Sequence, residues 1–195
     1  MSVYLPKHFS VEDEAFAVEM VTAYPFATLV TAGAEPWITH VPLLWDADQG
    51  LLGHVAKANQ HCRALETGTT IAIFHGPHAY VSPTWYQTPG QVPTWNYAVV
   101  HAHGQPRLLG DEASLAVLRR MVAAFDPDYV LDEDHLRRQA AAIVAFAMSI
   151  DRWDIKLKMS QNKPEADRLA VIDALRRHGG RAEQEVAAIM LGTNF

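Results

Sequence analysis

Histidines are the residues whose number and spacing most directly suggest chemistry in this sequence. The chain has 10 histidines among 195 residues. A dense group of them falls within 50 residues and consists of His54, His61, His75, His78, His101 and His103. Because side chains alternate along a strand, His101 and His103 would share one face of a strand. Two chemistries follow: a zinc or iron site, or imidazoles that form hydrogen bonds around a polar ligand pocket.

The composition around these histidines disfavours the metal site. Glu66 is the one acidic residue between Leu51 and His103. Catalytic zinc and non-haem iron sites commonly include a carboxylate ligand, which this stretch hardly offers. We therefore predict no metal site and interpret the imidazoles as hydrogen-bonding groups.

The sequence gives little support for a catalytic nucleophile or for a phosphate-binding loop. Ser82 precedes Pro83, which has no backbone N–H for an oxyanion hole, and the segment is no Gly-x-Ser-x-Gly elbow. Cys62, the single cysteine, is interpreted as a small half-buried side chain and not as a catalytic thiolate. Neither Gly-x-Gly-x-x-Gly nor Gly-x-x-x-x-Gly-Lys-Ser/Thr occurs. Acyl transfer and nucleotide hydrolysis are therefore excluded.

The segment from Thr94 to His103 favours a flat ligand with polar edges. On a strand, Trp95 and Tyr97 share one face, and Asn96 lies on the other. Aromatic faces can stack on a ring system, and neighbouring amides and hydroxyls can bind its edge. The alternative is that the two aromatic residues belong to an ordinary core or a dimer interface.

Lys57-Ala58-Asn59-Gln60 connects an expected strand to an expected helix. Backbone N–H groups at a helix start, together with a lysine, suit a phosphate group. The alternative is a solvated turn in which Asn59 caps the helix.

The elements that must position these residues are mostly strands. Expected strands, bounded by Gly, Asp and Pro, are 26–32, 37–45, 51–57, 69–75, 79–82, 96–103 and 143–150. Expected helices are 11–22 with Ser10 as its cap, 60–66, 113–125, 137–142, 164–177 and 182–191. Residues 83–94, rich in Pro and aromatic side chains, are expected to form an ordered loop. Strands and helices do not alternate regularly, which predicts a mainly β, α+β fold: an antiparallel barrel with peripheral helices.

Composition sets the broad class of the protein. The chain has 16 Lys and Arg against 22 Asp and Glu, a net charge of −6, and 49% hydrophobic residues. We expect a single globular domain, 1–195, with a helical C-terminal extension from about residue 164. No membrane segment or secretory signal is visible, and the lone cysteine suits a reducing compartment, so a cytoplasmic location is expected. The acidic balance argues against nucleic acid as the main partner.

Longer blocks of the sequence are similar to a known family. They are Pro25–Val30, His40–Leu44, Gly53–Asn59, Ile73–Tyr86, Val92–Tyr97, His101–Gly104 and Lys158–Asn162. Through these blocks the chain resembles, from about Tyr4 to Val171, the PaiB-type family of FMN-binding negative transcriptional regulators. The Gly-Pro-His-Ala-Tyr-Val-Ser-Pro-x-Trp-Tyr and Val-Pro-Thr-Trp-Asn-Tyr blocks are the most specific.

The resemblance implies an antiparallel split β-barrel, like that of pyridoxamine-phosphate oxidases, and a homodimer with FMN near the subunit interface. It implies that the flavin phosphate lies beside His54, Lys57 and Asn59 and that the ring lies along Thr39 and His40. The residues it assigns to the closure of the pocket are Trp95, Asn96, Tyr97, Ser160, Gln161 and Asn162.

The chain departs from the family pattern at a few positions. Cys62 replaces a usual tryptophan, Leu157 another usual aromatic residue, and Ala170 a usual glycine. The first two changes would loosen packing near the cofactor. None of the three removes a polar group that the resemblance assigns to the flavin.

The resemblance favours a flavin-binding regulator. The alternatives are an FMN-dependent oxidoreductase that acts on a small substrate and a flavin-storage protein without turnover. The family label also implies DNA as a partner, but the last expected helix carries Glu183 and Glu185 and no Lys or Arg. The basic cluster of this region is Arg176, Arg177 and Arg181. We therefore predict no direct sequence-specific DNA binding.

Overall fold

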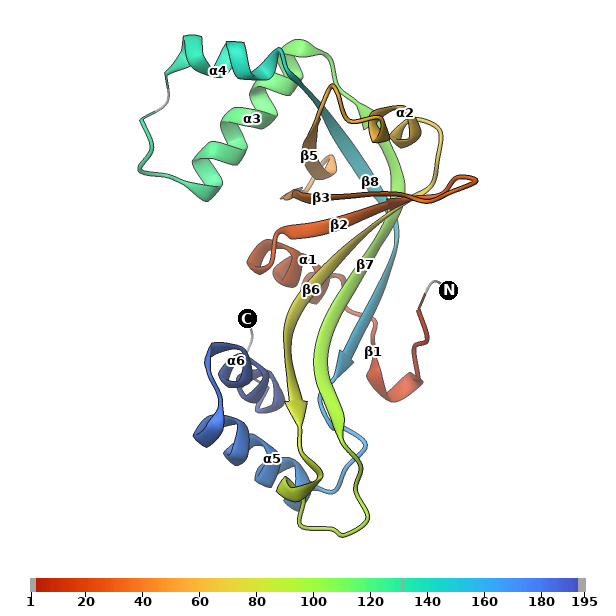
Figure 1. The fold of residues 1–195 in the computed structure, drawn as a ribbon, viewed down its shortest axis with the longest axis vertical. Helices are drawn as coiled ribbons and strands as arrows, with labels where there is room; N and C mark the ends of the chain where they lie inside the picture. The colour runs from red at the N-terminus through yellow and green to blue at the C-terminus, as the bar shows by residue number, and fades with distance from the viewer. Residues whose placement is uncertain (1–2, 131, 193–195) are drawn as a thin grey trace. The chain divides into compact units, whose positions relative to one another are not determined.

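The computed structural model describes residues 3–130 and 132–192. The strands are β1 (Ser10–Val11), β2 (Phe26–Thr31), β3 (Trp37–Pro42), β4 (Leu44–Asp46), β5 (Gly50–Ala56), β6 (Thr70–Val81), β7 (Thr94–Leu108) and β8 (Ile143–Lys158). The helices are α1 (Glu14–Ala23), α2 (His61–Leu65), α3 (Asp111–Phe125), α4 (Glu133–Ala140), α5 (Glu165–His178) and α6 (Arg181–Met190), with short 3-10 turns η1 (Lys7–Phe9) and η2 (Pro83–Trp85). The strand order is β3-β2-β6-β7-β8-β5-β4, and β1 pairs with β8 (Figure 1).

The described residues form two compact units. The central unit comprises Tyr24–Phe74 and His101–Trp153, and the terminal unit comprises the chain up to Ala23, His75–Val100 and the chain from Asp154 onward. The three long strands β6, β7 and β8 contribute residues to both units. In the central unit β5 pairs antiparallel with the first part of β8, and in the terminal unit β1 pairs antiparallel with its last part.

Two of the three long strands, β6 and β8, differ most from the sequence-based expectation. β6 continues through Gly76 and Pro77, where a break was expected, and β8 runs eight residues past Ile150. The pairing of β6 with β2 ends at Ala27 and Phe74. Pro77 therefore lies where β6 has left β2, and a proline is tolerated at a strand position that needs no ladder donor on that side.

The first helix is capped by a different residue than expected. Ser10 belongs to β1, and α1 begins at Glu14. The Asp13 carboxylate accepts the backbone N–H groups of Ala15 at 2.9 Å and Phe16 at 3.4 Å. Asp13 thus supplies the acceptor that the first turn of the helix needs.

The expected strand 37–45 is divided into β3 and β4, and the turn that follows is as expected. The Asp46 carboxylate accepts the N–H groups of Asp48 and Gln49 at 3.0 and 2.8 Å. Gly50 follows with φ of +77°, a backbone conformation that favours glycine. The turn sets the register of β4 against β5, in which Leu44 faces Leu52.

The central unit has an apolar core between its sheet and α3. Its buried members are Leu52, Val117, Met121, Ala145 and Ala147. These side chains come from β5, α3 and β8, so α3 is held on the sheet by burial of its apolar face.

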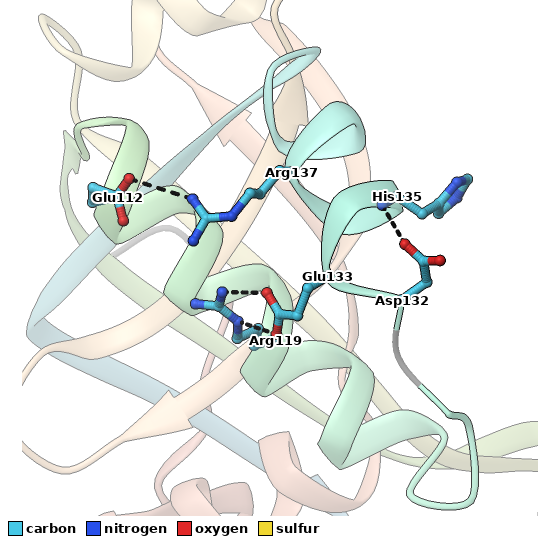
Figure 2. A network of polar contacts seen from close by, with 6 residues as sticks. All are labelled: Glu112, Arg119, Asp132, Glu133, His135 and Arg137. Atoms are coloured by element: carbon cyan, nitrogen blue, oxygen red, sulfur yellow. Dashed lines mark hydrogen bonds and ion pairs between the residues drawn. The ribbon is translucent and has the colours of Figure 1, made fainter.

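Helices α3 and α4 lie side by side in the central unit (Figure 1). Figure 2 shows that the Arg119 guanidinium of α3 donates to both carboxylate oxygens of Glu133 on α4, and that Arg137 of α4 reaches back to Glu112 at 3.8 Å. The Asp132 carboxylate accepts the His135 N–H at 2.6 Å and caps α4. Ion pairs on the solvent-facing side thus hold α3 and α4 together.

Helices α5 and α6 lie side by side in the terminal unit (Figure 1) and are joined by Gly179 and Gly180. Both helices were expected from the sequence. Both helices carry buried apolar side chains, among them Val171, Leu175, Val186 and Met190. Among the described residues, none of the helices combines the length and apolarity that a membrane crossing requires.

Candidate functional site

The residues that the resemblance assigns to the flavin fall into two groups, one in each unit. Thr39, His40, His54, Lys57 and Asn59 belong to the central unit. The terminal unit holds Trp95, Asn96, Tyr97, Ser160, Gln161 and Asn162. Each group is described by itself below.

Thr39 and Asn59 lie together in the central unit. The Asn59 side-chain N–H donates to Thr39 Oγ1 at 3.2 Å, although the two residues come from β3 and from the turn before α2. Both contact His61: its Nδ1 lies 2.7 Å from Thr39 Oγ1, and its backbone N–H donates to Asn59 Oδ1 at 3.0 Å. The Asn59 side chain thus accepts the first N–H of α2, while Gln60 occupies the N-cap position that one interpretation of the sequence gave to Asn59.

The imidazole of His61 continues this network into the interior. Its Nε2 lies 2.8 Å from Thr31 Oγ1, which in turn lies 2.7 Å from Thr70 Oγ1. His61 is 1% exposed, and Thr31 and Thr70 are fully buried. Burial lowers the pKa of His61, so the imidazole is neutral at pH 7 and has one donor and one acceptor nitrogen. A neutral imidazole bonded at both nitrogens is satisfied without a charge in the core.

Most backbone N–H groups of the turn 57–60 and of the following helix start are used within the protein. Lys57 N–H donates to Ala142, Asn59 N–H to Ala56, and Cys62 N–H back to Asn59. With α2 only five residues long, a phosphate at this turn would depend mainly on side chains, above all on Lys57.

Lys57 lies at the edge of a small pocket of about 190 Å³. Its ammonium is 3.7 Å from the Asp111 carboxylate, and both side chains are largely exposed. The pocket is also lined by Glu112 and by Arg137, which face each other across α3 and α4. Exposed ion pairs of this length contribute little to stability, so the Lys57 ammonium can change partner at small cost.

His40 and His54 have separate surroundings. His40 is exposed on β3, and its Nδ1 lies 2.9 Å from Thr28 Oγ1 on the neighbouring strand. His54 on β5 contacts Met121 of α3, with Nδ1 3.2 Å from the sulfur, and burial lowers its pKa. His54 thus faces the apolar core beneath α3.

Trp95 and Tyr97 lie together in the terminal unit and line an open pocket of about 350 Å³. His75 and His78 line the same pocket. The His78 and Tyr80 rings lie 6.2 and 6.0 Å from the Trp95 ring. The lining is mostly apolar, which suits the face of a flat ring system.

Asn96 and Ser160 bind each other in the interior of the terminal unit. The Ser160 hydroxyl donates to Asn96 Oδ1 at 3.1 Å, and the Asn96 amide N–H reaches Met190 Sδ of α6 at 3.4 Å. Ser160 has φ of +60°, the left-handed region that few residues other than glycine adopt. Because side chains alternate along a strand, Asn96 of β7 points inward and Trp95, which is 51% exposed, faces outward.

The turn that contains Ser160 is held by its own side chains. Gln161 accepts the Met159 N–H at 2.6 Å and donates to the Leu157 carbonyl at 2.5 Å, while Asn162 is exposed. Lys158, which sequence analysis did not single out, donates to the Trp95 carbonyl at 2.8 Å and to the Thr94 hydroxyl. Burial, together with the nearby Lys156 and Lys163 ammoniums, lowers the pKa of Lys158.

The aromatic loop 83–94 is ordered by α5, as its composition predicted. The Asp167 carboxylate accepts the N–H groups of Gln87 and Thr88 at 2.8 and 2.9 Å. The Trp85 ring stacks on His178 at 6.4 Å. Lys163 lies over the Tyr86 ring at 5.5 Å and donates to Gln91 at 2.6 Å.

Sequence reasoning missed three contributors to these two groups. His61 was noted as a histidine but not placed beside Thr39, and its position at a helix start next to Asn59 was the available signal. Arg137 and Asp111 lie more than 50 positions from Lys57, and no local pattern connects them.

Comparison with known proteins identifies the family of this chain. Residues 3–152 match the family described as "Putative FMN-binding domain". This chain belongs to that FMN-binding family. FMN is accordingly its cofactor.

A curated relative supports the same assignment. The protein named "Protease synthase and sporulation protein PAI 2" from Bacillus subtilis is 30% identical, with 96% of each chain covered. This similarity confirms the resemblance to the PaiB-type family that the sequence blocks indicated.

Solved structures confirm the fold of this FMN-binding family member. The flavocytochrome Anf3 from Azotobacter vinelandii matches with a TM-score of 0.64 and 15% identity, over 79% of this chain and 72% of that one. The FAD and heme binding protein from Mycobacterium smegmatis matches with a TM-score of 0.63 and 17% identity, over 83% and 78%. The predicted antiparallel split β-barrel with peripheral helices is thus confirmed.

Proposed function

We propose that this protein binds FMN through Lys57, Thr39 and Asn59, at an interface between two copies of the chain, and that it serves as a flavin-binding regulator. The observation that carries the proposal is the fixed pair of Thr39 and Asn59. Part-buried hydrogen bonds among Thr39, Asn59 and His61 hold the two side chains, and Asn59 lies two positions after Lys57 in the sequence. Such preorganised polar groups lower the entropic cost of ordering a site around a ligand.

The chemistry of these side chains fits FMN. The flavin phosphate needs a cation, and Lys57 is an exposed ammonium whose present partner is a weakly held carboxylate. The polar edge of a flavin needs hydroxyl and amide groups, which Thr39 and Asn59 supply. When bound, FMN supplies reversible one- and two-electron redox chemistry.

The terminal unit by itself holds a surface that suits a flat ring. Trp95 and Tyr97 present aromatic faces with an apolar floor. We propose this surface as one on which a flat ring stacks. Asn96, Ser160 and Gln161 act there by fixing the backbone that carries the aromatic residues, because their polar groups bond to one another and to their own turns.

An exposed apolar face supports the homodimer. β3 is the end strand of the sheet order, and Phe26 and Ile38 on the outer face of β2 and β3 are 66% and 58% exposed. In the antiparallel register Phe26 faces Pro42, and Ile38 faces Val30. The hydrogen-bonded pair of Thr28 and His40 lies between these two apolar pairs. Exposed apolar side chains beside an end strand favour burial against another protein surface, and a second copy is the occupant that the resemblance implies.

The regulatory role is preferred over turnover. The Bacillus relative is named for protease synthesis and sporulation, which is consistent with regulation. FMN-dependent oxidation of a small substrate is the second candidate, favoured by the open aromatic pocket beside His75 and His78. Fold similarity alone does not distinguish them.

Titration of the purified, flavin-free protein with FMN tests the proposal. Flavin fluorescence should be quenched along a saturable isotherm, and light scattering should show two chains per particle. Absence of saturation from a protein that is folded by circular dichroism would overturn FMN binding. Steady oxidation of NADH or NADPH by the loaded protein would support the oxidoreductase in place of the regulator.

A further inference from the structure

We propose that His61 is the positioning residue of the flavin site: its buried imidazole and its backbone N–H fix the Thr39 hydroxyl and the Asn59 amide in the orientation that receives FMN. The inference rests on the proposed function of this site. Neither the sequence blocks nor the similar proteins assign a role to His61.

The contacts show how much of each side chain His61 determines. Thr39 Oγ1 has the His61 Nδ1 on one side and the Asn59 N–H on the other, at 2.7 and 3.2 Å. Asn59 Oδ1 accepts the His61 N–H at 3.0 Å. Oxygen and nitrogen of the Asn59 amide are thereby distinguished, because only the oxygen can accept from the backbone.

The same contacts define what is left for a ligand. An asparagine amide has two N–H donors, and only one of those of Asn59 is used by Thr39. The threonine hydroxyl keeps one hydrogen-bonding position beyond its two named contacts, a donor or an acceptor according to the tautomer of His61. The site therefore offers an amide donor and a hydroxyl in a fixed relative orientation, which suits a ligand with polar edge atoms.

The imidazole itself is held from two further directions. Its Nε2 lies against Thr31 Oγ1 at 2.8 Å, and the Trp37 ring stacks on it at 6.2 Å with 24° between the ring planes. His61 is 1% exposed. A side chain locked in this way transmits the rigidity of the sheet to Thr39 and Asn59, the arrangement expected of a supporting residue in a preorganised site.

The two ring nitrogens of His61 contact different residues, Nδ1 contacting Thr39 and Nε2 contacting Thr31. Substitutions that keep one contact or the other therefore distinguish the positioning role from a purely structural one. An asparagine at position 61 places its polar atoms near the position of Nδ1 and can serve Thr39. A glutamine places them near the position of Nε2 and can serve Thr31. His61→Asn and His61→Gln therefore form a matched pair with the same chemistry and opposite partners.

The experiment is FMN titration of the wild-type protein, His61→Asn and His61→Gln, each checked for its fold by circular dichroism. Loss of one hydrogen-bonding partner corresponds to a roughly three- to tenfold change in affinity. We expect His61→Asn to bind FMN within about twofold of wild type and His61→Gln to bind it about three- to tenfold more weakly. Equal affinities of the two variants would overturn the positioning role.

A double-mutant cycle with Thr39→Val provides the second readout. If His61 acts through Thr39, adding His61→Gln to the Thr39→Val variant should reduce FMN affinity little further. Adding it to the Lys57→Ala variant should reduce FMN affinity by the same factor as in the wild-type protein. Equal factors in both backgrounds would contradict the inference. Failure of the wild-type protein to bind FMN would instead remove the proposed function, and this inference with it.

Discussion

Asp167 and Gln87, 80 positions apart in the chain, are joined by a hydrogen bond of 2.8 Å between a fully buried carboxylate and a backbone N–H. The same carboxylate oxygen accepts the N–H of Thr88 at 2.9 Å. The Asp167 carboxylate thus fixes the aromatic loop 83–94 on α5. The hydrogen bond from Thr88, reinforced by that from Gln87 and by the Lys163 charge, holds the pKa of this carboxyl below its usual range.

Substitution Asp167→Ala should lower the melting temperature and make the loop susceptible to proteolysis, because the backbone N–H groups of Gln87 and Thr88 lose their acceptor. Limited proteolysis followed by mass spectrometry measures the effect within 83–94. Asp173→Ala is the matched control, since Asp173 is an exposed carboxylate on the same helix, paired with Arg177. Equal cleavage of both variants would argue against the anchoring role.

The lowered pKa also predicts the direction of a pH effect. A carboxyl whose pKa is lower in the folded state contributes its stability above its unfolded pKa of about 4 and loses it as the pH falls through the folded value. The wild-type protein should therefore lose more stability than Asp167→Asn on acidification below about pH 4. Denaturant unfolding at pH 7 and pH 3.5 compares the two, and parallel losses would contradict the prediction.

Substitution Lys57→Ala should weaken FMN binding more than riboflavin binding, because riboflavin has no phosphate for the ammonium. Loss of a charge-assisted hydrogen bond corresponds to about 1.5–3 kcal/mol, or roughly ten- to hundredfold in affinity. Fluorescence titration with both ligands measures the difference. Similar losses for the two would place the phosphate away from Lys57.

Asp111→Asn should change the affinity for FMN in the opposite direction to Lys57→Ala. Asp111 holds the Lys57 ammonium at 3.7 Å in the ligand-free chain and would repel a phosphate. Removing its charge should strengthen FMN binding by about two- to fivefold, the scale of an exposed ion pair, and more at low salt. Asp173→Asn, which removes an exposed carboxylate of α5 that is paired with Arg177, is the control. A weaker affinity of Asp111→Asn would show that this carboxylate supports the site.

Ile38→Glu on the outer face of β3 should convert a dimer into single chains of 21.6 kDa, because a buried unpaired carboxylate opposes association. Light scattering at micromolar concentration measures the mass. Leu169→Glu introduces the same charge at an equally exposed apolar residue of α5 and should leave the mass unchanged. A wild-type protein that is already a single chain would defeat the prediction.

The purified protein should not bind DNA sequence-specifically at physiological salt, with or without FMN. Arg177 pairs with Asp173 at 2.6 Å and Arg181 with Glu185 at 2.7 Å, so two of the three arginines near the α5–α6 junction already have acidic partners. Three phosphate contacts there would give a salt slope of roughly −2.7. Nanomolar binding to a defined operator in excess competitor DNA would show a recognition surface elsewhere.

Local sequence order determined most of the elements and the family of this chain. The helices 113–125, 164–177 and 182–191 were found within a few residues, because a helix depends on neighbours three and four positions apart. The sequence blocks that resemble the PaiB-type family likewise identified the split barrel and FMN. A local rule was wrong at Pro77, which β6 accommodates beyond the residues that pair with β2.

Tertiary structure alone decided which polar side chains meet. Thr39 and His61 are 22 positions apart, and His61 and Thr31 are 30 apart. Their contact depends on the register of β3 on β2, in which Leu29 faces Thr39 and Thr31 faces Trp37. A slip of β3 by one residue would turn Thr39 to the face of the sheet opposite Thr31, leaving every short-range pattern in the sequence unchanged. The hydrogen bonds that fix the site therefore depend on the register of the sheet, and local composition does not predict them.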